Sequence, residues 1–582
     1  MIVKNIKLVS TFNLKHLGII MLSLGISACG NVEEQKAQDI ADHIFSNGKV
    51  YTLEADNPWA GAVAVKDDRI VFVGSAEDVQ NYTGPETQIH DLNGRIMMPG
   101  FIDTHAHAIS GGAYVNTLSL DTFAGTEDWI KAVGEYAEAN EDLPLIFGYG
   151  FLASVFGEEG PTKEMLDSVV SDRPVFIMDE GFHSGWANSM AMEKLGITKD
   201  TIDPTPGFNF YKRDQDGNPT GWFLEGTASD AMDRLNVFTE KSVTDGTGRV
   251  FDIMNEYGVT SVFDAGALDV AGMALAVMKN LDDADEFTVR LVGSVMVASP
   301  EHIEGVLDQI DELAKISKTD NYHIRMLKIM DDGTIEGRTA GMFEDYQNDP
   351  GNNGATALTQ QQITDLVVEA AGRQIDVHVH ALGDRTIHET LNAIEAARKA
   401  YGDSSSRYTI CHVQVITDEA VKRFAELDVI AQSTPLWASY DMGGKPFVSD
   451  DQFNRYFRFN SYKQEGVRLT FGSDFPASGA GTLGMSPIFN IEIGHTRQSA
   501  GQPDALIQPP IEERLDVASL IRGYTYDAAY QLHMEDEIGS IKVGKKADLI
   551  ILDKNPLESG PYDIHKIEVD MTMMDGQVVY KK

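Results

Sequence analysis

The chain has 582 residues, which is too many for one small core, so we expect a large barrel or sandwich with accessory parts. Its 47 Lys and Arg residues against 89 Asp and Glu residues give a formal net charge of -42. This acidic excess argues against a nucleic-acid partner, whose phosphates would be repelled, and against a polybasic membrane surface. A hydrophobic content of 42%, with 53 Gly and 20 Pro, excludes a disordered or collagen-like chain.

The N-terminus is typical of an exported protein. Lys4, Lys7 and Lys15 precede a short apolar run that ends in Ser27-Ala28-Cys29-Gly30. A basic flank, a short apolar stretch and small residues form a secretory signal, and the run is too short to span a bilayer as a helix. The tetrapeptide that ends at Cys29 resembles a bacterial lipobox, in which the cysteine is acylated. We predict a lipoprotein signal peptide over 1–28 and a tether over 29–42; the alternative is an ordinary signal peptide with a chance cysteine.

The two cysteines bear on location and redox state. Gly30 follows Cys29, where inner-membrane lipoproteins often carry aspartate, so the predicted site is the outer membrane, facing the periplasm. The lipid on Cys29 would be the only membrane link. Cys411 then has no disulfide partner, and we expect it to be a buried small hydrophobe.

Both ends of the chain predict β-structure. Residues 44–51, 62–65 and 70–74 alternate in polarity and are separated by turn residues. Near the C-terminus, 539–552 predicts a turn and an apolar strand, and 574–580 predicts a closing hairpin. We therefore expect one small β-sandwich domain formed from both termini, over 43–98 and 535–582.

The middle of the chain alternates apolar strands with helical stretches such as 304–313 and 387–394, which is the signature of βα units. There are about eight strands, as a (β/α)8 TIM-like barrel of the α/β class requires, here over 99–534. The residues after the first strand, about 114–235, are too many for a connection and predict an inserted subdomain. The strand candidates are 100–103, 260–263, 290–295, 324–329, 375–379, 408–412, 429–433 and 467–471.

Metal-binding side chains stand at the predicted strand ends, where barrel enzymes place their active sites. The i, i+2 spacing of His105 and His107 aims both rings at one point. Neutral imidazole and carboxylate are the usual ligands of a divalent ion such as zinc, which is the expected cofactor, with one or two ions bound. Two ions would need a negatively charged bridge, which Lys328 could supply only after carboxylation. The set is His105, His107, Lys328, His380, His412 and Asp474.

Each of these residues also has a structural interpretation. An isolated His-x-His motif is often only polar packing. Lys328 could pair with an acid or point out of the barrel. His378 shares a strand face with His380 but lies one layer deeper, so we interpret it as packing. Five other histidines that lie outside the pattern are interpreted as surface or structural residues: His16, His43, His90, His302 and His565.

The stretch Pro99 to His107 resembles the opening of the amidohydrolase superfamily. Other segments resemble its YtcJ-like branch, the amidohydrolase-3 group, which includes N-substituted formamide deformylases. The resemblance covers nearly all of the mature chain, with the motifs in the branch's order. These segments are 179–189, 219–225, 328–334, 380–385, 472–476 and 544–549.

The resemblance implies roles for the strand-end residues. Asp474 would be a metal ligand and proton shuttle, and Lys328 the carboxylated bridge. The insertion motif usually reads Asp-Gly-His, whereas here Phe182 precedes His183, the implied substrate contact. Arg338 and Glu225 are either polar groups of the pocket or a structural ion pair. The implied metal ligands are His105, His107, His380, His412 and Asp474.

The leading hypothesis is a metal-dependent amidohydrolase that cleaves a non-peptide amide or formamide-type C–N bond of a small molecule. The metal lowers the pKa of bound water to about 7, and hydroxide attacks the carbonyl carbon. Asp474 takes the proton and returns it to the leaving amine, while the metal and His183 stabilise the oxyanion.

Other functions remain open on the same metal centre: a dipeptide or N-acyl-amino-acid hydrolase, a lactonase, or a deaminase. Arg338 or Arg497, if either faces the pocket, would favour a substrate that bears a carboxylate. A non-enzymatic envelope lipoprotein on a retired barrel is a third hypothesis. The expected partner is a small-molecule substrate, with no nucleic acid, and the sequence leaves a homodimer open.

Overall fold

The computed structural model describes residues 40–121, 124–179, 184–204, 210–317, 319–347, 349–402 and 404–582. The predicted signal peptide, Cys29 and most of the tether fall outside these ranges, and so does His183. Among the helices described, none combines the length and the apolar character needed to cross a membrane.

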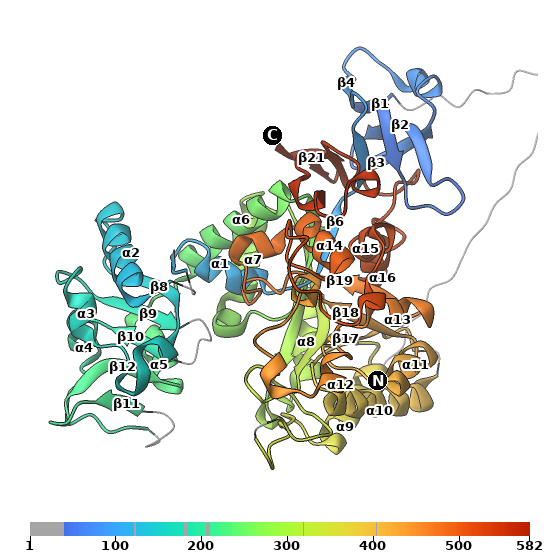
Figure 1. Cartoon of the computed structure of the whole chain (residues 1–582). Helices are drawn as coiled ribbons and strands as arrows, with labels where there is room; N and C mark the ends of the chain where they lie inside the picture. The colour runs from blue at the N-terminus through green and yellow to red at the C-terminus, as the bar shows by residue number, and fades with distance from the viewer. Residues whose placement is uncertain are drawn as a thin grey trace, which may run out of the picture. The chain divides into compact units, whose positions relative to one another are not determined.

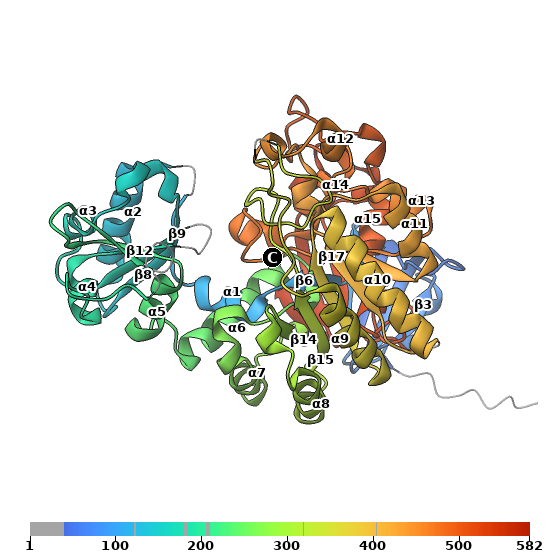
Figure 2. The same cartoon turned by 90° about the horizontal axis from the view of Figure 1, so that it is seen from below.

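Eight parallel strands form the barrel, and each follows the previous one in the chain, as the sequence predicts (Figures 1 and 2). Most of their residues are buried, which agrees with the apolar runs expected of parallel strands covered on both faces. The strands are β6 (Phe101–Ala106), β13 (Val259–Asp264), β14 (Arg290–Val297), β15 (Tyr322–Met330), β16 (Asp376–Ala381), β17 (Tyr408–His412), β18 (Val429–Ser433) and β19 (Leu469–Phe471).

The first and last strands, β6 and β19, meet without a regular ladder, so the barrel is nearly closed. The Thr104 hydroxyl donates to the Phe471 carbonyl at 2.8 Å, and the Asp474 N–H donates to the His105 carbonyl at 2.7 Å. The seam therefore fixes Asp474 beside His105.

Helices follow most barrel strands and bury one apolar face. In α10, the side chains of Ile387, Leu391 and Ile394 are buried at helical spacing, and this helix packs against β16. The helices after the inserted segment are α6 (Glu240–Glu256), α7 (Ala274–Asp283), α8 (Val306–Ile316), α9 (Gln360–Gly372), α10 (Asp384–Tyr401), α11 (Asp418–Glu426), α12 (Asp450–Phe453), α13 (Phe459–Gln464), α14 (Pro487–Thr496), α15 (Val517–Gly523) and α16 (Tyr526–Gln531).

Strands from both ends of the chain share one mixed sheet, in the order β22-β21-β20-β5-β1-β2-β3, with β4 paired to β1. β20 pairs antiparallel with β5, which leads directly into β6 of the barrel. The closure of this sheet into a sandwich, and the domain boundaries, stay predictions. The strands are β1 (His43–Tyr51), β2 (Trp59–Lys66), β3 (Arg69–Gly74), β4 (Gln88–Asp91), β5 (Ile96–Pro99), β20 (Leu549–Leu552), β21 (Val569–Met574) and β22 (Gln577–Lys581).

The long segment after β6 carries a third sheet of six strands, in the order β11-β12-β10-β9-β8-β7. Its own apolar cluster includes the buried rings of Trp129, Phe151 and Trp186. The elements are α1 (Ala108–Tyr114), β7 (Leu118–Ser119), α2 (Thr126–Ala139), β8 (Ile146–Phe151), α3 (Lys163–Asp167), β9 (Val175–Asp179), β10 (Ser184–Ala187), α4 (Ser189–Leu195), β11 (Phe210–Arg213), β12 (Pro219–Leu224) and α5 (Gly226–Leu235).

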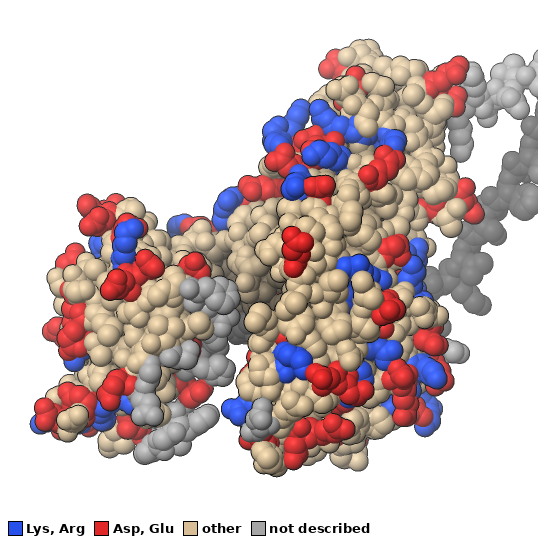
Figure 3. Space-filling view, viewed as in Figure 1, with Lys and Arg blue, Asp and Glu red and all other residues tan. Residues whose placement is uncertain are grey.

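The acidic excess is distributed over the surface. Asp and Glu side chains are spread over the visible face in Figure 3, with Lys and Arg among them. Several basic side chains pair with acids one helical turn away, as Lys279 does with Asp283. These exposed pairs contribute little stability, and the charge mainly keeps the surface hydrated.

Candidate metal centre

Three predicted ligands converge at the barrel seam. Nε2 of His105 and Nε2 of His107 each lie 3.3 Å from Oδ1 of Asp474. All three side chains are buried, and their ligand atoms lie within 4.8 Å of one another. The spacing of two along the end of β6 thus brings both rings to the carboxylate.

Backbone hydrogen bonds hold this arrangement. Oδ1 of Asp103 accepts the N–H groups of His105 and Ser473, both at 3.1 Å, and so ties the first strand to the segment that carries Asp474. Asp264, at the end of β13, accepts the N–H groups of Ile109 and Gly266 at 3.0 Å. Two buried carboxylates therefore position the ligands without facing them.

The hydrogen bonds of His107 indicate which of its nitrogens is free. Its Nδ1 lies 2.8 Å from the Gly266 carbonyl, which can only accept, so Nδ1 carries the proton. In the neutral ring, Nε2 then points a lone pair at the Asp474 carboxylate. Two acceptors at 3.3 Å repel each other unless a cation lies between them. Nε2 of His105 and Oδ1 of Asp474 are also buried without a hydrogen-bond partner, so the donor set fits a divalent ion.

His380 and His412 pack beside these three residues. The His412 ring lies 4.7 Å from the His105 ring and 4.4 Å from the His380 ring, between centroids. Both nitrogens of His412 and Nε2 of His380 are buried without a hydrogen-bond partner. Burial, followed by the charge of Lys328, lowers the pKa of His380 to about 3. Burial also holds the pKa of His105 and His412 well below the usual value, so these rings are neutral, as metal binding requires.

Lys328 is fully buried on β15, and its Nζ lies 3.3 Å from Sγ of Cys411. In the strand register Lys328 is the partner of His378 and not of His380. Its charge nevertheless lowers the pKa of His380, so it acts electrostatically on the metal centre. Carboxylation of this lysine stays a prediction. Cys411 is buried and free, as expected from the sequence.

His378 has a more specific role than packing. Its Nε2 lies 2.9 Å from Nδ1 of His105, and one of these nitrogens donates to the other. The contact orients the His105 ring and leaves its Nε2 directed at the site, as hydrogen-bond partners of metal ligands do. The same i, i+2 spacing that relates His105 to His107 also relates His378 to His380. This spacing is the sequence feature that could have indicated a role for His378 at the site.

Two further neighbours were not singled out from the sequence. Oδ1 of Asp332 lies 3.7 Å from Nε2 of His380, and this carboxylate also accepts the N–H groups of Leu382 and Gly383. The Trp437 ring lies 5.5 Å from the ring of His412. Asp332 follows the end of a strand, which could have indicated it, whereas nothing local distinguished Trp437.

Arg497 does not meet the condition set for a substrate anchor, which was that its side chain faces the pocket. Its side chain is fully buried, and the guanidinium donates to four backbone carbonyls, those of Tyr456, Phe457, Gln508 and Pro509. These carbonyls have no nearer donor, so the arginine is structural.

Arg338 and Glu225 do not form a pair with each other. Arg338 pairs with Asp349 at 2.9 Å on the surface, so it forms a structural ion pair. Glu225 stands at the N-cap position of α5, in the inserted segment. His183 lies outside the described residues.

Comparison with known proteins gives the family. The pattern of the Amidohydrolase family matches residues 88–580. An N-substituted formamide deformylase of Arthrobacter pascens is 25% identical over 93% of this chain and 98% of its own. The Bacillus subtilis protein YtcJ is 28% identical over 93% and 99%, and the exoenzymes regulatory protein AepA of Pectobacterium carotovorum is 29% identical over 74% and 93%.

Among solved structures, an uncharacterized metal-dependent hydrolase from Pyrococcus horikoshii superposes with a TM-score of 0.72. It is 23% identical, and the match covers 89% of this chain and 99% of that one. This likeness supports the fold. With the family match over most of its length, the chain belongs to the amidohydrolase family and is a metal-dependent hydrolase that acts on carbon–nitrogen bonds.

Proposed function

We propose that this protein hydrolyses a non-peptide amide or formamide-type bond of a small molecule, using a divalent ion, with zinc as the expected metal. The observation that carries the proposal is the contact of two imidazole nitrogens, each 3.3 Å from one carboxylate oxygen. His105, His107, His380, His412 and Asp474 would hold the ion, with a carboxylated Lys328 as the bridge if there are two.

When bound, the ion supplies a Lewis acid that polarises the carbonyl and acidifies water. Asp474 supplies the proton transfers. Burial alone would raise the pKa of this carboxyl, but the interactions with the neighbouring His107, His412 and Lys328 side chains lower it, so the group is ionised. It accepts a proton as water forms the new C–O bond, and donates one to nitrogen as the C–N bond breaks.

The name of one relative and the contacts of two arginines favour this substrate class over a carboxylate-bearing one. One relative is named as an N-substituted formamide deformylase. A carboxylate-bearing dipeptide or N-acyl amino acid would need a cationic anchor, and the two arginines proposed for that role are engaged elsewhere: Arg497 with backbone carbonyls and Arg338 with Asp349. A lactone or deaminase substrate would use the same centre.

The non-enzymatic alternative has support in the name of AepA, a regulatory protein. Retired enzymes lose ligands, and this chain retains the full set at the strand ends. We therefore favour catalysis.

Metal quantitation coupled to a hydrolysis screen tests the proposal. The purified protein is loaded with zinc and assayed on formamides, N-acyl amino acids, dipeptides and lactones. We expect at least one tightly bound ion per chain, and turnover of formamides or simple amides that a chelator abolishes. Substoichiometric metal together with no turnover of any class would refute the enzyme and favour a binding protein.

We further propose that the protein is exported and anchored to the outer membrane by lipid on Cys29. Labelling of cells with a radioactive fatty acid tests this. We expect the label in the wild type and its loss, together with loss of membrane association, in Cys29→Ala. A processed, unlabelled protein would indicate an ordinary signal peptide.

A further inference from the structure

A second polar cluster, which we call the carboxylate cluster, lies on the loops that follow the barrel strands. It consists of Glu336, Gln414, Asp441 and Tyr456. The first three follow β15, β17 and β18, respectively, so they stand at the same end of the barrel as the metal centre. None of the four has a role in the hydrolysis derived above.

The amide of Gln414 connects the two acids. Its Nε2 lies 3.3 Å from Oε1 of Glu336 and 3.5 Å from Oδ2 of Asp441. The other oxygen of Asp441 accepts the N–H groups of Gly443 and Gly444, both at 2.9 Å. Oδ2 of Asp441 is therefore the oxygen left to face Glu336.

Tyr456 provides an independent observation. Its side chain is fully buried, yet its hydroxyl has no hydrogen-bond partner in the described part of the chain. A backbone bridge between Val415 and the residue itself holds the tyrosine beside the Gln414 segment. A buried hydroxyl without a partner is costly, so a ligand that completes it would be stabilised.

Three oxygens surround the place where a side chain of Gly444 would begin. A Cβ added there would lie 2.3 Å from Oδ2 of Asp441, 2.9 Å from Oε1 of Glu336 and 3.0 Å from the Tyr456 hydroxyl. The φ of Gly444 is -79°, which any residue adopts, so the backbone does not require glycine here. A side chain there would overlap the Asp441 carboxylate, so glycine at this position is what lets the three oxygens converge.

The three oxygens together have the chemistry of a cation-binding site. Three oxygens around one point match the three N–H donors of a primary ammonium group. Bonds from an ammonium to carboxylates are among the strong hydrogen bonds of proteins. The Gln414 amide, as oriented, presents N–H groups to the acids, which suits an organic cation better than a metal ion.

The electrostatics of Glu336 favour the binding of a cation. The residue as a whole is exposed, but crowding around its carboxyl, followed by the charge of Asp441, raises its pKa to about 7. An arriving ammonium group would relieve this repulsion.

Short segments of chain link the cluster to the metal centre. Gln414 lies two residues after His412, and Trp437, whose ring packs on His412, lies four residues before Asp441. Phe457, next to Tyr456, donates its N–H to the Gln414 carbonyl at 3.0 Å. The cluster and the metal centre therefore share loop segments at one end of the barrel.

We propose that the carboxylate cluster binds a primary ammonium group of the substrate, so that the enzyme prefers small amides carrying a protonated amine. This inference rests on the proposed amidohydrolase function, which it narrows to a substrate class. Glu336 and Asp441 supply the charge and Tyr456 the third oxygen, and Gly444 allows the three to approach one another.

The test uses two matched series of probes with the zinc-loaded full chain. One series is N-(ω-aminoalkyl)formamides with two to six methylenes, and the other is N-alkylformamides of equal length. We expect a kcat/KM at least about tenfold higher for the amino series at the best length, as charge-assisted hydrogen bonds provide. Equal values in the two series would overturn the inference while leaving the proposed function intact.

Variants assign the preference to the cluster. Glu336→Gln, Asp441→Asn and Gly444→Ala should each bring the ratio between the two series towards one. Gly444→Ala does so without changing charge. The matched control is Glu344→Gln, which removes an exposed acid from the same loop and should keep the wild-type ratio. A variant that slows both series equally would indicate a merely structural role and would overturn the inference.

A binding measurement separates the two proposals. Calorimetric titration of zinc-loaded Asp474→Asn with both series reports affinity without turnover. Tighter binding of the amino series, lost when Glu336→Gln is added, supports the cluster even if no formamide is hydrolysed. Equal binding of both series counts against the cluster whatever the wild-type activity.

Discussion

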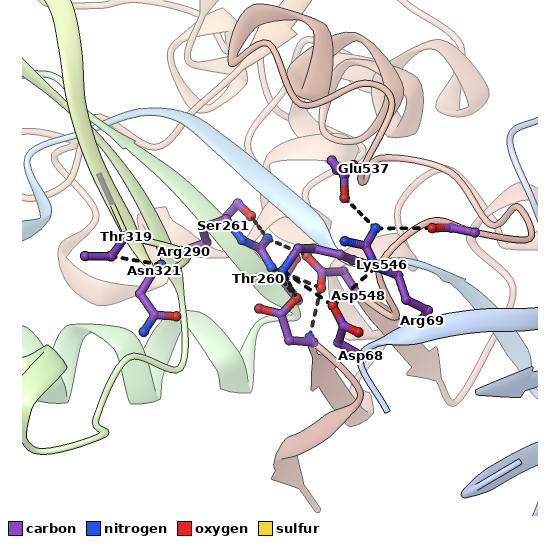
Figure 4. A network of polar contacts seen from close by, with 12 residues as sticks. Asp68, Arg69, Thr260, Ser261, Arg290, Thr319, Asn321, Glu537, Lys546 and Asp548 are labelled. Carbon is purple, nitrogen blue, oxygen red and sulfur yellow. Dashed lines mark hydrogen bonds and ion pairs between the residues drawn. The ribbon is translucent and has the colours of Figure 1, made fainter. Parts of the chain in front are cut away.

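Both ends of the barrel bury ionisable side chains. At one end these side chains are paired with opposite charges, whereas at the other end several of their polar atoms have no hydrogen-bond partner. At the end where β14 begins, Arg290 donates to Asp548 at 2.7 Å and to Asp575 at 2.8 Å, and Lys546 donates to Asp575 at 2.7 Å. Figure 4 shows this network, which joins Arg290 of the barrel to Asp548, just before β20, and reaches Asp68 and Arg69 through Lys546. At the other end, Nε2 of His105 and Oδ1 of Asp474 are buried without a hydrogen-bond partner among the described residues.

This difference separates stability from function. The network around Arg290 places opposite charges together, so its energy is realised when the chain folds. The metal centre leaves buried acceptors without partners, which costs stability until a cation arrives. The same kinds of residue therefore stabilise the fold at one end of the barrel and are arranged to bind an ion at the other.

The largest expected effect is at the metal centre. Asp474→Asn should reduce turnover by roughly 10²- to 10⁴-fold, because it removes the proton acceptor. The four histidines remain, so metal content should stay the same. Steady-state kinetics and metal analysis check this against Asp504→Asn, an exposed site. Near-normal turnover would show that Asp474 is not the proton shuttle.

At the opposite end we expect loss of stability instead. Arg290→Met should lower the free energy of unfolding by about 3–5 kcal/mol, because two carboxylates lose a buried partner. Urea denaturation measures this, and the metal-loaded enzyme should retain its kcat. Adding Asp548→Asn and Asp575→Asn should restore part of the stability. An unchanged unfolding midpoint in Arg290→Met would remove the contrast between the two ends.

His378 should act on the metal rather than on stability alone. His378→Phe removes the hydrogen bond to His105 and should weaken metal affinity by about 10- to 100-fold. Competition with a chromophoric chelator measures the affinity. His378→Gln, which can still bond to Nδ1 of His105, should recover part of it. A wild-type metal affinity in His378→Phe would show that this residue contributes only to packing.

The smallest effect concerns pH. Burial alone would raise the pKa of Asp575, but Arg290 and Lys546 hold it below the usual value. A lowered carboxyl pKa contributes stability above the unfolded-state value of about 4, and this is lost as pH falls through the folded-state value. The stability difference between the wild type and Arg290→Met should therefore shrink below about pH 4. A constant difference down to pH 3 would contradict the linkage.

The barrel was predictable because its signals are local. The strands β17 and β18 have the bounds expected from their apolar runs, and the alternation of strand faces placed His105 and His107 together. β19 begins at Leu469, two residues later than expected, because apolar character does not show where a short ladder begins.

The errors concern contacts between distant segments. The apolar pattern cannot give the register that sets Lys328 level with His378, so the bond from His378 to His105 was not foreseen. Arg497 appeared suitable for a substrate because a charged residue suggests a charged partner. In the structure its partners are backbone carbonyls from two segments, 456–457 and 508–509, and such partners cannot be inferred from residue type.

The pairing of β20 with β5 has a consequence for the order of synthesis. β5 leaves the ribosome early and runs straight into the strand that carries His105, but its partner, Leu549–Leu552, is among the last residues made. At usual elongation rates the wait is roughly 20–90 s. Throughout that time the first ligand strand lacks the ladder beside it, and a chain cut short before residue 549 never acquires it. The strand that leads into the first ligand strand therefore gains its sheet partner only when synthesis is nearly complete.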